Sequence, residues 1–233
     1  MLHRVQALER HAVRHSDLVV ACTDADASRL SELYGAPPAL EVVPNGFDAE
    51  IVNSASVDGI EARRSLGIPE DVRLLLFVGS AAPHNMEAVH FLQRDVLSQL
   101  DPHVHLLLVG DCGQAAAEEP ALAGRTHRPG RLGDLRPAFA AADVAVNPVA
   151  TGSGSNLKLA EYLASGLPVV TTAVGLRGFE GHTSGVMVAE RDRFAAVLAE
   201  AQLLGRPHRS VLDLSWDSLA RRLHGVYARL LGL

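Results

Sequence analysis

The chain has 233 residues, of which 48% are hydrophobic and 4% aromatic, and it carries 21 Lys+Arg against 27 Asp+Glu, a formal net charge of −6. This length allows one large core or one medium core with an appendage, because single cores stop growing near ~250 residues. The Gly- and Ala-rich apolar composition argues against disorder and suits aliphatic strands packed by helices. The charge balance, without long runs of one sign, makes nucleic acid a poor candidate partner.

The N-terminus and the cysteines bear on the cellular compartment. Residues 1–10 predict an amphipathic helix and lack the continuous apolar stretch of a secretory signal. No window approaches the ~18 to 20 apolar residues that span a bilayer, and the closest are 74–79 and 163–174. Cys22 and Cys112 are too few and too scattered for a disulfide framework or a zinc site. We therefore expect a cytoplasmic protein with no transmembrane segment.

The first part of the chain predicts less than a complete domain. Its pattern gives helices and strands in alternation, at 3–14, 17–22, 25–33 and 40–43. Two strands cannot make a core, so we expect residues 1–50 to be a remnant, and the strand at 17–22 predicts association with a second copy or a partner subunit. The polar, turn-rich stretch 52–59 reads as part of a linker that covers residues 51–71.

From residue 72 onward, short apolar runs alternate with amphipathic stretches. Strands are predicted at 73–78, 104–109, 143–147, 167–171 and 185–188, with helices between most of them. This alternation predicts an α/β fold, with a parallel sheet, helices on both faces and a ligand site at the carboxyl ends of the strands. The candidate loops are 79–84, 110–113 and 147–156. A last amphipathic helix is predicted over 216–231.

One segment has the order strand, Gly-rich loop, helix. The strand at 143–148 leads into the loop 150–156 and then into a helix at 157–164, so glycines and free helical N–H groups meet where an anion could bind. Lys158 adds a positive charge in the first helical turn, and Glu161 shares its face and could accept hydrogen bonds from ribose hydroxyls. The plain alternative is a surface ion pair after an ordinary connection. The Gly spacing fits neither a P-loop nor a dinucleotide-binding fingerprint.

Three other patterns in the sequence have the residue types of a metal or ligand site. Asp24 and Asp26 imitate a metal-binding Asp-x-Asp pair, but Thr23 three residues before Asp26 predicts a helix N-terminal cap. His103 and His105 lie on one side of a strand without an evident third ligand. We expect no metal. His84 lies in a loop at a predicted strand end and is a candidate contact for the donor phosphate or sugar described next.

The segment 143–170, and above all the run Gly-Ser-Gly-Ser-Asn-Leu-Lys-Leu-Ala-Glu at 152–161, resembles the donor motif of glycosyltransferase family four and its relatives, the glycosyl transferases group 1. Further segments resemble other parts of the same proteins, at 17–23, 42–48, 74–85, 130–143 and from Ser215 onward. The resemblance implies the Rossmann-like C-terminal domain of the GT-B fold. It divides the chain into an acceptor-side remnant (1–50), a linker (51–71), a nucleotide-sugar-binding domain (72–214) and a closing helix (215–233).

The resemblance also implies roles for individual residues. It places the donor diphosphate and sugar against Gly79, Ser80, His84, Ser153, Gly154, Ser155, Asn156, Leu157 and Lys158. Glu161 would contact the ribose, and Arg131 and Leu132 would lie by the base. Two departures matter. Ser153 stands where many members have an acid that contacts the donor sugar, and Ser80 and Asn85 stand where many have Arg and Lys, which leaves the diphosphate to Lys158.

The implied activity is transfer of a sugar, hexosyltransferase-like, from a nucleotide sugar to an unknown acceptor, with retention and without a cofactor or metal. No catalytic residue can be named. Such enzymes hold the acceptor on an N-terminal domain of which this chain has fewer than 50 residues. The chain is therefore expected to be inactive without the rest of that domain or a partner. The alternatives are a non-catalytic nucleotide-sugar-binding module and a GT-B relative such as a sugar-nucleotide epimerase.

Overall fold

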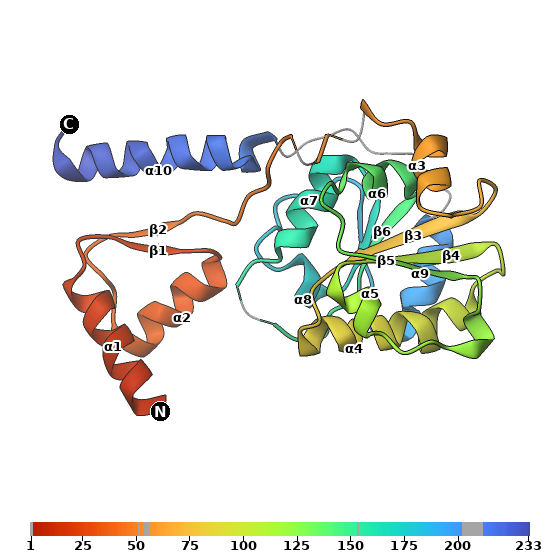
Figure 1. Cartoon of the computed structure of the whole chain (residues 1–233). Helices are drawn as coiled ribbons and strands as arrows, with labels where there is room; N and C mark the ends of the chain where they lie inside the picture. The colour runs from red at the N-terminus through yellow and green to blue at the C-terminus, as the bar shows by residue number, and fades with distance from the viewer. Residues whose placement is uncertain (1, 51, 54–55, 153, 202–211) are drawn as a thin grey trace.

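The computed structural model describes residues 2–50, 52–53, 56–152, 154–201 and 212–233 (Figure 1). Within them, the largest sheet is parallel throughout and has the strand order β5-β4-β3-β6-β7-β8. Its strands are β3 (Arg73–Val78), β4 (Val104–Val109), β5 (Thr126–Gly130), β6 (Val144–Asn147), β7 (Val169–Thr171) and β8 (Val186–Val188). The predicted α/β class is thereby confirmed.

Helices cover both faces of this sheet because the strands are apolar on both sides. Along β3, Leu74 and Leu76 belong to one core cluster, and Leu75 and Phe77 to the other. The first cluster is closed by α3 (Gly59–Ser65), α6 (Arg136–Ala141) and α7 (Leu157–Ser165). The second is closed by α4 (Pro83–Phe91), its π-helical continuation at Leu92–Val96, α5 (Asp111–Ala115) and α9 (Phe194–Ala201).

The N-terminal residues form a separate small unit, seen in red and orange in Figure 1. It consists of α1 (Leu2–His15), β1 (Val19–Ala21), α2 (Asp24–Tyr34) and β2 (Leu40–Val42), and β1 and β2 form a parallel pair. Thr23 caps α2 by accepting a hydrogen bond from Asp26 N at 2.9 Å, which confirms the predicted cap. The final helix α10 (Trp216–Leu231) is tied to this unit through Arg222, which donates to Val42 O at 2.8 Å.

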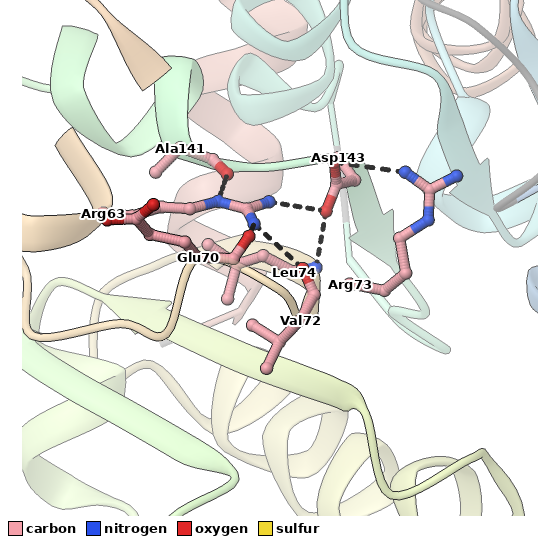
Figure 2. A network of polar contacts seen from close by, with 7 residues as sticks. All are labelled: Arg63, Glu70, Val72, Arg73, Leu74, Ala141 and Asp143. Carbon is pink, nitrogen blue, oxygen red and sulfur yellow. Dashed lines mark hydrogen bonds and ion pairs between the residues drawn. The ribbon is translucent and has the colours of Figure 1, made fainter. Parts of the chain in front are cut away.

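A polar network joins the amino ends of β3 and β6, the edge of the sheet where these strands begin (Figure 2). Arg63 of α3 donates to Asp143 Oδ2 at 2.8 Å and to the carbonyls of Glu70, Val72 and Ala141. The same carboxylate oxygen accepts from Leu74 N at 2.7 Å. The Arg63 side chain is only 11% exposed, so this network is a packed part of the fold that fixes α3 against the sheet.

The structure adds two features to the predicted pattern. The edge strand β5 was not predicted, because its sequence Thr-His-Arg-Pro-Gly is polar and half-buried and has no apolar alternation. The helix α3 falls inside the segment expected to be a linker, and the buried Ala62, Ile68 and Val72 place that part of the chain in the core of the sheet. The short helix α8 (Ala173–Leu176) follows β7.

Candidate functional site

A cavity of about 620 Å³ lies over the carboxyl ends of the strands. Residues after five strands line it: Gly79 and Ser80 after β3, Gly110 and Asp111 after β4, Arg131 after β5, Thr151, Gly152 and Gly154 to Lys158 after β6, and Arg177 after β7. The helices α4 and α7 add His84, Asn85 and Glu161. The cavity is therefore at the edge of the sheet where a parallel α/β fold binds ligands.

The floor of the cavity depends on close contact between two loops. Gly110 has φ +96°, and a Cβ atom on it would lie 2.4 Å from the carbonyl oxygen of Gly79. Only glycine has low energy in this conformation, and only glycine leaves room for the neighbouring loop. Gly79 N donates to Val109 O at 2.9 Å, which continues the register of β3 and β4 into the loops. Backbone groups of both loops thus reach the cavity without side chains between them.

Lys158 occupies the first turn of α7 and is held in one position. Its Nζ donates to Asn85 Oδ1 at 2.6 Å and lies 4.1 Å from the centroid of the Phe77 ring. Asn85 is itself buried, and its Nδ2 donates to Ser80 O at 3.1 Å and to Ser80 Oγ at 3.3 Å, so its oxygen faces the lysine. Burial lowers the pKa of the Lys158 ammonium to about 8. The group is still mostly protonated at pH 7 and is a fixed positive charge.

Glu161 lies one turn further along the same face of α7. Burial raises the pKa of its carboxyl, and the neighbouring positive charge of Lys158 opposes that rise. No described residue donates a hydrogen bond to this carboxylate, which lines the cavity. A carboxylate accepts hydrogen bonds readily, so Glu161 can receive the hydroxyl groups of a bound ligand.

The loop before α7 presents backbone groups to the cavity. Asn156 is the N-cap of α7 but makes no side-chain cap hydrogen bond, so the first N–H groups of the helix are left for a ligand. On the outer side, Arg177 Nε donates to Gly154 O at 2.9 Å, and Asn45 N donates to Ser155 Oγ at 3.3 Å. A Cβ atom on Gly178, which has φ +86°, would lie 2.5 Å from Ser155 Cβ. These contacts fix the position of the loop from the side that faces away from the cavity.

The far end of the cavity is lined by a charge pair. Arg131 donates from Nε and Nη2 to the two oxygens of Asp111, each at 2.5 Å, in a bidentate arrangement. These hydrogen bonds lower the pKa of Asp111. Arg131 is exposed, with its guanidinium fixed beside the end of β5. Its flat face is available to a planar group such as a nucleobase.

Most of the predicted site residues converge on this one cavity, with two exceptions. Leu132 is absent from its lining and packs against the core cluster beside α6. Ser153 lies outside the described residues. Sequence reasoning missed Asp111 as a partner of Arg131, although it falls in a predicted strand-end loop. It also missed Arg177, because the loop after the strand at 167–171 was not among the candidates.

The histidine pattern has a structural explanation. His105 Nδ1 and His127 Nε2 of neighbouring strands are 3.0 Å apart, and burial lowers the pKa of both imidazoles. In the described ranges, no cluster of three or more His, Cys, Asp and Glu side chains is arranged to hold a metal ion. None of the helices there has the length and apolarity needed to cross a bilayer.

Two family models match the chain. The model described as Glycosyl transferases group 1 matches residues 72–204, which contain the sheet and the cavity, and the model described as Glycosyltransferase Family 4 matches residues 1–51. Among curated proteins, the D-inositol 3-phosphate glycosyltransferase of Thermobispora bispora is 32% identical over 96% of this chain, and that of Thermomonospora curvata is 33% identical over 94%. The chain spans only 58% of the length of either relative.

Solved structures show the same fold at low sequence identity. Anabaena HepE in complex with UDP and glucose has 19% identity and a TM-score of 0.76, covering 97% of this chain and 68% of that one. Sucrose-phosphate synthase from Thermosynechococcus elongatus has 18% identity and a TM-score of 0.73, covering 99% of this chain and 62% of the other. These likenesses extend over both the N-terminal unit and the larger sheet.

Proposed function

Because the chain belongs to the glycosyl transferases group 1 family, we propose that it is the donor-binding portion of a glycosyltransferase and that its cavity holds a nucleotide sugar. One observation carries this proposal. A half-buried lysine fixed by Asn85 and the carboxylate of Glu161, to which no described residue donates a hydrogen bond, share one face of α7 beside free helical N–H groups. A cation with N–H donors suits a diphosphate, and the carboxylate suits a sugar hydroxyl.

The order of these groups along the sheet gives the proposed orientation of the donor. The base lies at the β5 end beside Arg131, and the ribose hydroxyls bond to Glu161. The diphosphate lies over the end of β3, between Gly79, Ser80, Lys158 and the N-terminal amides of α7. Leu132 is partly buried and packs against the core cluster, and it makes no contact with the base in this orientation. His84 lies near the diphosphate and the sugar.

The proposed reaction follows from where charge develops. The bond between the anomeric carbon and the diphosphate oxygen breaks, and that oxygen keeps the electron pair. The acceptor hydroxyl forms the new bond to carbon, with retention, and gives its proton to the departing diphosphate oxygen. Lys158 and the helix amides stabilise the departing diphosphate, so neither a metal ion nor a cofactor is required.

The acceptor side is proposed to be completed by further polypeptide. The N-terminal unit pairs only β1 with β2 among the described residues, and it leaves large apolar side chains exposed, including Val5, Leu8 and Val20. Such surface favours burial against another chain or domain. A second candidate function, a binding module without transfer, is favoured by the same small unit, because catalysis requires both reactants to be held together.

Ligand-induced stabilisation tests the donor site. UDP, GDP, ADP, CDP and TDP are each added to the protein, and the melting temperature is followed; a ligand at 100 times its Kd stabilises by about 2.7 kcal/mol. The double variant Lys158→Ala, Glu161→Ala should abolish the shift. The matched control Arg64→Ala, Glu70→Ala removes an exposed ion pair in α3 and the turn after it and should retain the shift. Absence of stabilisation by every nucleoside diphosphate would refute the proposal.

Transfer separates the two candidates. Nucleotide binding with neither hydrolysis nor transfer, even after addition of a separately expressed acceptor domain, identifies a binding module. Conversion of the sugar without an acceptor identifies an epimerase.

A further inference from the structure

Arg177 and Lys158 are the two cations of the cavity for which the described residues supply no carboxylate partner. Arg177 follows β7, is half-buried and lines the cavity. Its Nε is bonded to Gly154 O at 2.9 Å, but no described carboxylate pairs with its guanidinium. The nearest acid in the sequence, Glu180, accepts instead from Gly178 N at 3.0 Å. Arg131, by contrast, is neutralised by Asp111.

The hydrogen bond to Gly154 fixes the direction of this guanidinium. With Nε held by the pinned loop, the terminal nitrogens of Arg177 remain as donors, and Nη2 lies 3.5 Å from the position of a Cβ atom on Gly152. Gly152 also lines the cavity. The N–H groups of the Arg177 guanidinium thus lie at the edge of the Gly-rich loop, and a guanidinium can donate two parallel hydrogen bonds to a carboxylate or phosphate.

The strand order separates Arg177 from the diphosphate position. Lys158 is locked to Asn85 and Phe77 over the end of β3, so it cannot swing toward β7. The strand β6 lies between β3 and β7 in the sheet. Neighbouring strands are ~4.8 Å apart, which puts the two strand ends about 10 Å from each other. A donor with its base at β5 and its diphosphate at β3 therefore brings its sugar to Arg177.

We infer that the donor sugar carries an acidic group, a hexuronate carboxylate, that pairs with Arg177. This inference rests on the proposed donor site and names its substrate class. An unpaired, half-buried guanidinium favours an anionic ligand, because it otherwise loses hydration without gaining a partner. The cavity lining has three cationic side chains, Lys158, Arg131 and Arg177, against the two carboxylates Asp111 and Glu161. Asp111 pairs with Arg131, so Arg177 remains as a cation that an acidic group of the ligand can pair with.

Binding of three matched ligands tests the inference. Dissociation constants are measured by calorimetry for UDP, UDP-glucose and UDP-glucuronate, or for GDP, GDP-mannose and GDP-mannuronate if the protein prefers guanine. The wild-type chain should bind the uronate at least about tenfold more tightly than the neutral sugar nucleotide, because a charge-assisted pair is lost with the latter. In Arg177→Met this preference should vanish, so that the uronate and the neutral sugar nucleotide bind with the same Kd, because the partner of the carboxylate is gone. Arg177→Lys should retain part of the preference.

The control variant is Arg131→Met at the other end of the cavity. It should weaken all three ligands by the same factor and leave the preference for the uronate intact. Equal affinity of the wild-type chain for uronate and neutral sugar would overturn the inference, while nucleoside diphosphate binding would leave the donor site standing. An equal loss of all three ligands in Arg177→Met would also overturn it, since Arg177 would then act only as a clamp on the loop. Failure of every nucleoside diphosphate to bind would instead refute the donor site itself.

Discussion

Replacing Asn85 tests the contact that holds Lys158 in the cavity. Asn85→Leu keeps the size of the side chain but removes the oxygen that accepts from Lys158 Nζ at 2.6 Å. A hydrogen bond to a charged group contributes about 1.5 to 3 kcal/mol, so at a fixed pH the ratio of neutral to protonated amine should rise about tenfold or more. Asn85→Asp puts a negative charge at the same place and should change that ratio in the opposite direction by a similar factor.

The assay uses an unusual feature of the composition: Lys158 is the sole lysine of the chain, beside 20 arginines. Acetylation by a small amine-reactive reagent therefore labels one internal position, which mass spectrometry separates from the N-terminal peptide. The labelling rate below pH 8 follows the neutral fraction of the amine. It should rise in Asn85→Leu and fall in Asn85→Asp. If both variants label like the wild type, or both shift in one direction, Asn85 does not set the charge of Lys158.

Three further predictions follow from the same structure. Lys158→Met should raise the free energy of unfolding of the unliganded protein at pH 7 by on the order of 1 kcal/mol. Burial lowers the pKa of Lys158 in the folded protein to about 8, so the cost of burying the charged ammonium is complete below pH 8 and decreases toward pH 10.5. The difference in stability between the variant and the wild type, measured by urea melts, should decrease over the same pH range. Gly110→Ala should lower the free energy of unfolding by more than about 3 kcal/mol. Gly67→Ala, where φ is +68° but an added Cβ atom meets no other atom, should lower it by about 1 kcal/mol. Equal losses of stability in the two variants would contradict the close approach of the loops. Arg63→Met should lower the free energy of unfolding by roughly 3 to 5 kcal/mol and leave nucleotide Kd unchanged, and a matching loss of affinity would contradict its separation from the site.

The sequence was sufficient for those parts of the fold that depend on apolar periodicity. Strands such as 73–78 and 104–109 are apolar on both faces, and the structure places them where the pattern predicted. The edge strand β5 escaped prediction because its stability comes from pairing with β4 and not from its own side chains. Helix α3 escaped for a related reason. It is short and polar, and Arg63 fixes it through contacts with segments distant in the sequence.

The candidate site was predictable where local spacing determines geometry. Lys158 and Glu161 lie on one face because they are three residues apart on a helix. The partner of Lys158 was not predictable, because Asn85 is 73 positions away and its orientation depends on Ser80. Arg177 was missed since an arginine after a short strand has no local signal. Only the strand order, which places β7 two positions from β3, brings it into the cavity.

The two ends of the sheet have different roles: one stabilises the fold and the other forms the cavity. The Arg63 network holds the amino ends of β3 and β6 (Figure 2), while the cavity occupies the carboxyl ends of the same strands. An evolving sequence can therefore exchange side chains such as Arg177 without disturbing the contacts that keep the strands in register. For protein engineering, this makes the cavity loops after β5 and β7 suitable targets for saturation libraries, with Arg63 and Asp143 left unchanged because they hold the strands.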